Sequence, residues 1–190
     1  MNIKDLEPKI VWHYFHDITQ IPRPSKKEER IIAYLLDFAR EHNLEARKDA
    51  VGNVVITKPA TPGKEGLPTV VLQSHVDMVC EKNSDVTHDF DNDPIETIID
   101  GDWVKANGTT LGADNGIGIA AQLAVLASTD IAHGKIEALF TVDEETGLTG
   151  ASSLEPGFIT GNILLNLDTE EEGEIYIGCA GGIGTKAYFR

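Results

Sequence analysis

The stretch TVVLQSHVD, residues 69–77, decides the fold of this chain. Residues 69–74 are dense in β-branched and aliphatic side chains, which is typical of a buried central strand. His75 and Asp77 follow that strand directly. Two further apolar runs, residues 136–142 and 163–167, also predict buried strands and are also followed by carboxylates. The ends of adjacent strands in an open α/β sheet converge on a crevice where ligands bind, so we expect these polar side chains to meet there.

Helical patterns alternate with the strands. Apolar spacing predicts helices over residues 6–19 and 114–128, and the stretch SKKE at 25–28 matches a capping box that opens another helix ending near Asn43. This alternation favours a sheet covered on both faces. Shorter strands are expected at residues 45–47, 53–57, 103–105 and 174–178, and the polar stretch 80–100 is expected to be a functional loop.

The composition argues against several classes of partner. The 190 residues include 16 basic and 31 acidic side chains, a net charge of −15. Such a surface repels nucleic acid and anionic lipid, so we expect neither as a partner. Cys80 and Cys179 form no CxxC pair, which fits a reducing compartment, and the first residues contain no apolar segment of signal-peptide length. We expect a soluble cytoplasmic protein with one domain.

The polar residues at the strand ends have side chains that bind metals. His75 and Asp77 stand two residues apart on a strand, so their side chains point the same way. This suits a metal-bound imidazole oriented by a neighbouring carboxylate, although a histidine-x-aspartate pair taken alone is more often structural. Asp114 lies among glycines at the start of a helix, where it could bind a metal, cap the helix, or do both.

Two adjacent glutamates follow the strand at 136–142. The side chains of Glu144 and Glu145 should point in different directions, so that one can bind a metal while the other stays free as a base. A solvated acidic loop is the alternative. Asp168 follows the run at 163–167. One histidine with carboxylates from several strand ends suits zinc, or manganese if oxygen ligands dominate, and two ions sharing a carboxylate could activate a water.

A nucleotide-binding interpretation is weaker. The segment GIGIAA, residues 116–121, has the spacing of a GxGxxA fingerprint. That fingerprint must follow a strand, whereas the polar segment ANGTT, residues 106–110, precedes this one. The chain also contains no GxSxG elbow and no Walker loop. The clusters therefore favour metal chemistry.

Taken together, the motifs resemble those of metallopeptidase family M20, and the likeness runs from the first helix to Arg190. Within the family, the chain is similar above all to bacterial dipeptidases that cleave Xaa-His. The segments that carry this similarity are IPRPS (21–25), THDF (87–90), GTTLGADNG (108–116) and EEEGEIYIGCAGG (170–182). The resemblance implies a three-layer α/β/α sandwich with a central, mostly parallel mixed sheet of the zinc exopeptidase type, incomplete at its C-terminal end.

The resemblance also implies a centre with two metal ions, usually zinc, with Mn2+ or Co2+ as substitutes. Asp114 would bridge the two ions. His75 and Asp168 would bind one of them, and Glu145 would bind the other. Family members often have a cis peptide after the bridging aspartate, here between Asp114 and Asn115.

The activity implied by the family is hydrolysis of unblocked dipeptides, preferentially Xaa-His. Glu144 would be the general base, and Asp77 would hold the His75 ring. Family members take the last ligand of the second ion from a histidine far downstream, and they insert a smaller lid and dimerisation domain. We therefore expect residues 1–190 to be the N-terminal part of the catalytic domain, without the lid through which the longer enzyme would form a homodimer.

Two alternatives stay open. Other M20-type amidohydrolases, such as tripeptidases, carboxypeptidases and N-acyl amino acid hydrolases, share the metal motifs. The chain could also be a metal-binding module without activity. The remaining histidines are expected to be surface or structural residues: His13, His16, His42, His88 and His133.

Overall fold

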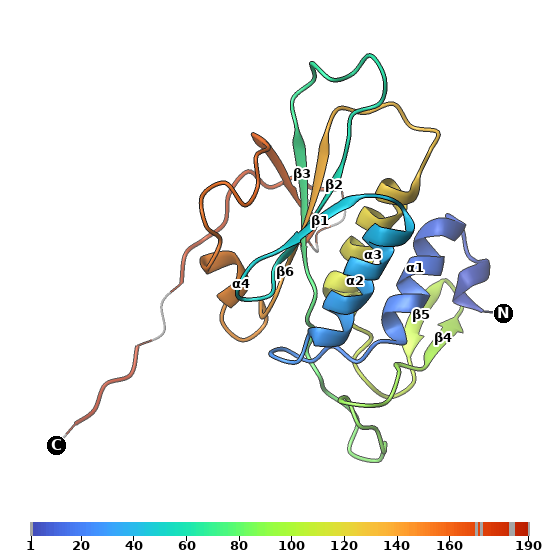
Figure 1. Ribbon diagram of the computed structural model, residues 1–190. Helices are drawn as coiled ribbons and strands as arrows, with labels where there is room; N and C mark the ends of the chain where they lie inside the picture. The colour runs from blue at the N-terminus through green and yellow to red at the C-terminus, as the bar shows by residue number, and fades with distance from the viewer. Residues whose placement is uncertain (1, 170, 172, 183–184, 190) are drawn as a thin grey trace.

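The computed structural model describes residues 2–169, 171, 173–182 and 185–189. A five-stranded sheet with the order β1-β2-β6-β3-β7 forms its centre (Figure 1). The strands of this sheet are β1 (Glu45–Lys48), β2 (Val54–Lys58), β3 (Val70–His75), β6 (Ile136–Thr141) and β7 (Ile163–Asn166). A separate two-stranded sheet consists of β4 (Thr97–Asp100) and β5 (Trp103–Ala106). The helices are η1 (Ile3–Asp5), α1 (Lys9–Thr19), α2 (Glu29–Glu41), α3 (Ala113–Ala127) and α4 (Thr149–Ser152).

Most strands of the central sheet run in one direction. β3 pairs in parallel with both β6 and β7, whereas β2 is antiparallel to both β6 and β1. Only β2 among these five strands therefore runs the other way, and the predicted mixed, mostly parallel sheet is confirmed. The carboxyl ends of β3, β6 and β7 lie at one edge of the sheet, where His75 is the register partner of Thr141.

Helices flank the sheet on both sides. α2 and α3 cover one face with α1 packed against α3, and the short α4 lies on the other side of the sheet (Figure 1). The core between the helices and the sheet includes Phe15, Leu35, Leu123 and Phe140. α3 lies close to β3 at Gly118, which has no side chain. A Cβ added at this position would be 3.2 Å from Ser74 Cβ. The predicted α/β/α arrangement is confirmed.

The predicted capping box at the start of α2 is wrong. The N-cap of this helix is Glu28, which makes no side-chain capping bond. Ser25 Oγ instead donates to Asp77 Oδ2 at 2.7 Å, and Glu28 Oε1 accepts from the backbone N–H of Asp143 at 3.0 Å. The local pattern predicted that Ser25 and Glu28 would cap the helix together. Each side chain instead bonds to a partner more than fifty residues away along the chain.

Two element boundaries also differ from the prediction. The first long helix begins at Lys9 rather than Leu6, because Pro8 occupies its N-cap position. Proline has no backbone N–H to donate and fits the start of a helix well. The stretch 80–100, expected to be a loop, ends in β4, which pairs with β5. The predicted short strand at 103–105 is confirmed as part of β5.

The last two predicted strands behave differently from the rest. β7 exists, but Ile163, Leu164 and Leu165 are 44%, 50% and 49% exposed, so the prediction that it is buried is wrong. It is an edge strand whose one neighbour in the described sheet is β3. Residues 174–178 form no strand, and the side chain of Ile177 is fully exposed. A β-prone sequence forms a strand only when a neighbouring strand satisfies its backbone groups.

The described part of the chain contains no helix long and apolar enough to cross a membrane. Cys80 and Cys179 are both free, and Cys179 is exposed. The two thiols therefore form no disulfide.

A buried carboxylate ties β6 to the segment that precedes β7. Glu137 is 1% exposed. Its oxygens accept from Lys135 Nζ at 2.8 Å, from the backbone N–H groups of Thr160 at 2.7 Å and Gly161 at 3.1 Å, and from Thr160 Oγ1 at 2.6 Å. Burial raises the pKa of Glu137, but these hydrogen bonds outweigh burial and lower the pKa to about 2. The folded state therefore binds this proton far more weakly than the unfolded chain.

We expect acid to remove the stabilisation that Glu137 provides. Because its pKa falls from 4.5 to about 2 on folding, this stabilisation is fully present above pH 4.5 and is lost as the pH falls towards about 2. A Glu137→Gln variant should lose on the order of 2–3 kcal/mol of unfolding free energy at neutral pH, and progressively less at lower pH. Urea denaturation of both proteins across this range measures the difference. A difference that stays constant with pH would contradict the prediction.

Candidate metal centre

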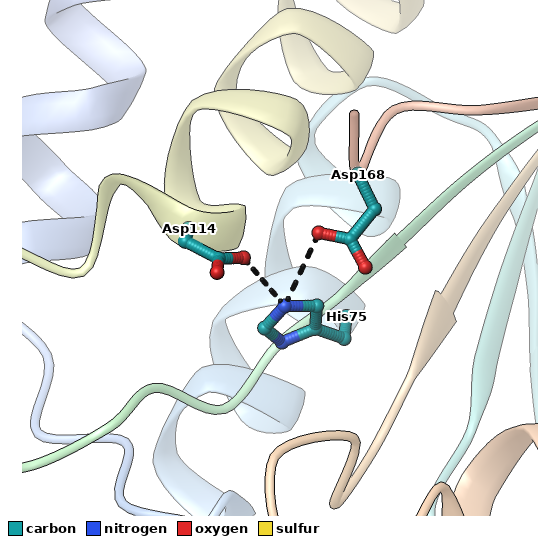
Figure 2. Close-up of side chains that lie close together, drawn as sticks. All are labelled: His75, Asp114 and Asp168. Atoms are coloured by element: carbon teal, nitrogen blue, oxygen red, sulfur yellow. Dashed lines mark hydrogen bonds and ion pairs between the residues drawn. The ribbon is translucent and has the colours of Figure 1, made fainter. Parts of the chain in front are cut away.

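The candidate site is built around His75 at the carboxyl end of β3. Its side chain is 1% exposed, and its Nε2 lies 2.9 Å from Asp114 Oδ1 and 3.6 Å from Asp168 Oδ1. Figure 2 shows the two carboxylates reaching the same ring nitrogen from α3 and from the segment after β7. One ligand atom from each of the three residues lies within 4.8 Å of the other two, which is close enough for a common metal ion.

Asp114 is placed by an irregular start of α3. Gly112, the N-cap, has φ +68, and Asp114 and Asn115 have non-helical backbone angles. The peptide bond between Asp114 and Asn115 is cis, as the family resemblance implies. The side chain of Asp114 is 51% exposed and pairs with His75, and among the described residues no backbone N–H donates to its carboxylate. The described contacts therefore match the metal-ligand interpretation of Asp114 better than the helix-capping one.

Asn115 holds Asp168 in place. Its Nδ2 donates to Asp168 Oδ1 at 2.7 Å and to the carbonyl oxygen of Leu167 at 2.9 Å. Asn115 is 3% exposed. It belongs to the GTTLGADNG segment, but sequence reasoning assigned it no role. Its position directly after Asp114 was the one available signal, and the contact with the end of β7 depends on the fold.

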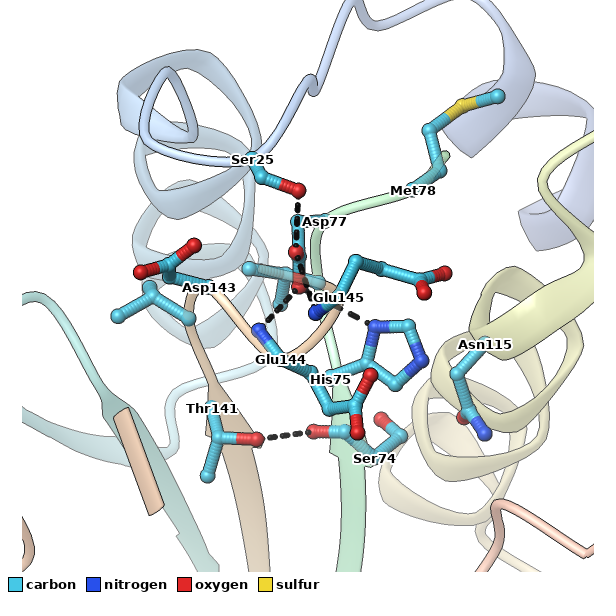
Figure 3. A network of polar contacts seen from close by, with 12 residues as sticks. Ser25, Ser74, His75, Asp77, Met78, Asn115, Thr141, Asp143, Glu144 and Glu145 are labelled. Carbon is cyan, nitrogen blue, oxygen red and sulfur yellow. Dashed lines mark hydrogen bonds and ion pairs between the residues drawn. The ribbon is translucent and has the colours of Figure 1, made fainter. Parts of the chain in front are cut away.

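The loop after β6 brings two glutamates close to the same imidazole. His75, Glu144 and Glu145 form a second group whose ligand atoms all lie within 4.8 Å of one another. The backbone N–H groups of Glu144 and Glu145 donate to the two oxygens of Asp77, at 3.0 and 3.2 Å. Figure 3 shows the two glutamate side chains pointing in different directions beside the ring. The structure thus brings together all six residues that the sequence singled out.

Asp77 is a fully buried anchor rather than a surface acid. Besides the two amides it accepts from Ser25 Oγ at 2.7 Å, and its Oδ1 lies 3.2 Å from His75 Nδ1 (Figure 3). Burial raises the pKa of Asp77, but the bonds from His75, Ser25 and the two amides outweigh burial and lower the pKa to about 2. An ionised Asp77 accepts a hydrogen bond from the N–H at His75 Nδ1, and so leaves Nε2 directed at Asp114 and Asp168.

The surrounding carboxylates favour a positive charge at His75. Burial lowers the pKa of His75, but the contacts with Asp168, Asp77 and Asp114 outweigh burial and raise the pKa to about 11. The site therefore stabilises a cation at the Nε2 position, which is also the position from which an imidazole binds a metal. An imidazole nitrogen with carboxylate oxygens is a donor set suited to zinc or manganese.

The two glutamates hold their protons more tightly than exposed ones do. Burial raises the pKa of Glu144, and the nearby charges of Asp168, Asp77 and Asp114 add to the increase while His75 opposes it. The pKa of Glu145 is raised by burial and by Asp114. A carboxylate with a raised pKa accepts a proton more readily than an ordinary one, which suits a group that must take up a proton and return it.

An α/β sheet that gathers an imidazole and several carboxylates at the ends of its parallel strands is typical of a metal-dependent enzyme. The chain belongs to peptidase family M20/M25/M40, whose family model matches residues 71–183, more than half of the chain. This family is metal-dependent, and the His75–Asp114–Asp168 group is able to hold a metal ion.

Two relatives are similar over almost the whole chain. The cytosol non-specific dipeptidase of Escherichia coli K12 is 52% identical over 181 residues, which make up 95% of this chain and 37% of that protein. The crystal structure of aminoacylhistidine dipeptidase from Vibrio alginolyticus matches with a TM-score of 0.92 and 56% identity, covering 94% of this chain and 36% of that one. The crystal structure of aminopeptidase PepT from Bacillus cereus matches with a TM-score of 0.74 and 27% identity, over 87% and 44% of the two chains. The chain thus spans little more than a third of the length of the first two relatives.

We expect Asp77→Asn to weaken zinc binding while leaving the fold intact. The amide keeps the shape of the side chain but removes the charge that orients His75 and holds the glutamate loop. Loss of such an outer partner costs about 10–100-fold in metal affinity. Competition with a chromophoric chelator measures the affinity. Glu137→Gln is the matched control, because Glu137 is also buried and ionised but lies at the opposite end of β6. Equal zinc affinities for wild type and Asp77→Asn would contradict this role.

Proposed function

We propose that this chain forms the N-terminal part of the catalytic domain of a metallo-dipeptidase. The observation that carries the proposal is the convergence of four carboxylates on the buried His75 ring: Asp114 and Asp168 form one group with it, and Glu144 and Glu145 form a second. The high identity to two dipeptidases supports the reaction class. The proposed reaction is hydrolysis of unblocked dipeptides, preferentially with a C-terminal histidine.

The proposed centre holds two zinc ions, with Mn2+ or Co2+ as substitutes. His75 and Asp168 would bind the first ion, Glu145 the second, and Asp114 both. The two overlapping groups of ligand atoms around His75 support this assignment. In the longer protein, a downstream histidine would complete the second ion's ligands, and a lid domain would supply the dimer contact. The location proposed for it is the cytosol, as in the name of the E. coli relative.

Each of the other site residues has a defined task in this proposal. Bound ions would polarise the scissile carbonyl and make a water more acidic. Glu144 would accept the proton of that water and pass it to the leaving amine, which its raised pKa favours. Asp77 would keep His75 Nδ1 protonated through the 3.2 Å contact, so that Nε2 stays available as a ligand. Asn115 would keep the Asp168 carboxylate turned towards His75.

The test is a peptidase assay on a protein that carries this chain together with the remainder present in its longer relatives. We expect zinc-dependent release of amino acids from Xaa-His dipeptides and slower cleavage of dipeptides without histidine. Activity on N-acylated amino acids or tripeptides alone would favour another M20-type hydrolase. Zinc binding by a folded protein that cleaves none of these substrates would overturn the enzymatic proposal.

A further inference from the structure

The loop that joins α1 to α2 contacts the backbone of the segments that carry His75 and Asp114. Its Arg23 is 2% exposed although it is a charged side chain. Nη1 donates to the carbonyl oxygens of Val76 and Asp77, each at 2.8 Å, and Nη2 donates to the carbonyl oxygen of Gly112. One guanidinium therefore joins the segment that follows β3 to the turn that precedes Asp114.

Ser25, two residues further along this loop, holds the same segment by its side chain. Its Oγ donates to Asp77 Oδ2 at 2.7 Å (Figure 3). Between the two, Pro24 forms an isolated parallel bridge with Met78. Asp77 is thus held at its backbone carbonyl by Arg23 and at its carboxylate by Ser25. No local sequence pattern links these residues, because more than fifty positions separate them.

The surrounding backbone leaves room for the guanidinium. A Cβ added at Gly112 would lie 2.5 Å from Arg23 Nη2, and one added at Gly116 would lie 2.8 Å from the same atom. The two glycines on either side of Asp114 therefore allow the arginine to approach. Burial lowers the pKa of Arg23 to about 10, with Asp77 and Asp114 among the charges that oppose the decrease, so the group stays positively charged at neutral pH.

We infer that Arg23 and Ser25 are positioning residues that fix the separation between His75 and Asp114 before any metal binds. This inference rests on the proposed metal centre. The two segments that carry these ligands come from different elements, β3 and the start of α3. Among the described contacts, the guanidinium is the donor shared by both segments. Its positive charge also offsets the carboxylates around the site.

The test compares Arg23→Met with Lys58→Met in this chain. Lys58 is a matched control, because its Nζ donates to three carbonyl oxygens at the other end of α3, those of Val125, Leu126 and Ser128. Hydrogen exchange of the metal-free proteins and zinc affinity are both measured. Arg23→Met should speed amide exchange over residues 75–78 and 111–116 by at least about tenfold, because the loss of even one hydrogen bond from a charged group costs that much and this variant loses three. It should also weaken zinc binding by about 10–100-fold.

Lys58→Met should speed exchange at the end of α3 and leave zinc affinity unchanged. Unchanged exchange over 75–78 and 111–116 in Arg23→Met, or unchanged zinc affinity, would overturn the positioning role. If the wild-type chain binds no zinc while Arg23→Met still shows the faster exchange, the proposed metal centre is wrong. The role of Arg23 in holding the two segments together is then still supported. Ser25→Ala removes a single hydrogen bond to Asp77 and decides the question if Arg23→Met does not fold. It should weaken zinc binding with the fold intact, and unchanged zinc affinity in this variant would overturn the role of Ser25.

Discussion

Replacing Glu144 with glutamine should lower kcat by several orders of magnitude while leaving zinc in place. Glutamine keeps the size of the side chain and the backbone N–H that donates to Asp77, but it cannot accept a proton from water. General-base catalysis contributes about 10²–10⁴-fold, so kcat should fall by that factor. The measurement is steady-state hydrolysis of an Xaa-His dipeptide by the longer protein, with zinc content determined by elemental analysis on the same samples.

The neighbouring residue provides the matched control. Glu145→Gln should lose zinc and activity together, because Glu145 is the proposed ligand of the second ion. The two variants differ by one position in the same loop, and both keep their backbone bonds to Asp77. If Glu144→Gln turned over substrate normally, Glu144 could not be the base. If Glu144→Gln lost zinc and Glu145→Gln kept it, the two roles would be reversed.

Asp114→Ala should remove zinc from the chain. Asp114 is the proposed bridge between the ions, and its carboxylate lies 2.9 Å from His75 Nε2. Since loss of an outer partner alone costs about 10–100-fold in affinity, loss of the shared ligand should cost more than about 100-fold. Elemental analysis after dialysis should find zinc in the wild type and none in the variant. The wild type should also gain thermal stability when zinc is added, because a ligand that binds the folded state stabilises it, whereas the variant should not.

Asp102→Ala controls for the change in net charge. Asp102 is exposed between β4 and β5, away from the site, so this variant should bind zinc as the wild type does. Equal zinc content in Asp114→Ala and the wild type would rule out the bridging role.

The candidate site could be selected from the chain because all its members except Asp114 follow apolar runs. His75 and Asp77 follow the run at 69–74, and Glu144 and Glu145 follow the one at 136–142. Parallel pairing of β3 with β6 brings the two ends together, as the general behaviour of such sheets predicts. To predict that these residues meet, it was enough to know that the strands are parallel, and the alternation of helices and strands implies parallel strands.

Local sequence patterns could not predict which residues support the site. Arg23, Ser25 and Asn115 each hold a site residue or its backbone through contacts that span many positions of the chain. Ser25 was assigned to helix capping because its local pattern fits that role well. In the folded chain its hydroxyl donates to an ionised carboxylate, and a hydrogen bond to a charged acceptor is stronger than one accepted from a neutral backbone N–H.

The sequence by itself determined the three long helices, most of the strands and the set of candidate ligands, because these depend mainly on the spacing of apolar residues along a few turns or one strand. Tertiary structure decided which strands are covered, as the exposed β7 and the unpaired residues 174–178 show. It also decided which polar groups share a hydrogen bond. Burial and pairing depend on the neighbours that folding supplies, and a local pattern contains no information about residues fifty or more positions away.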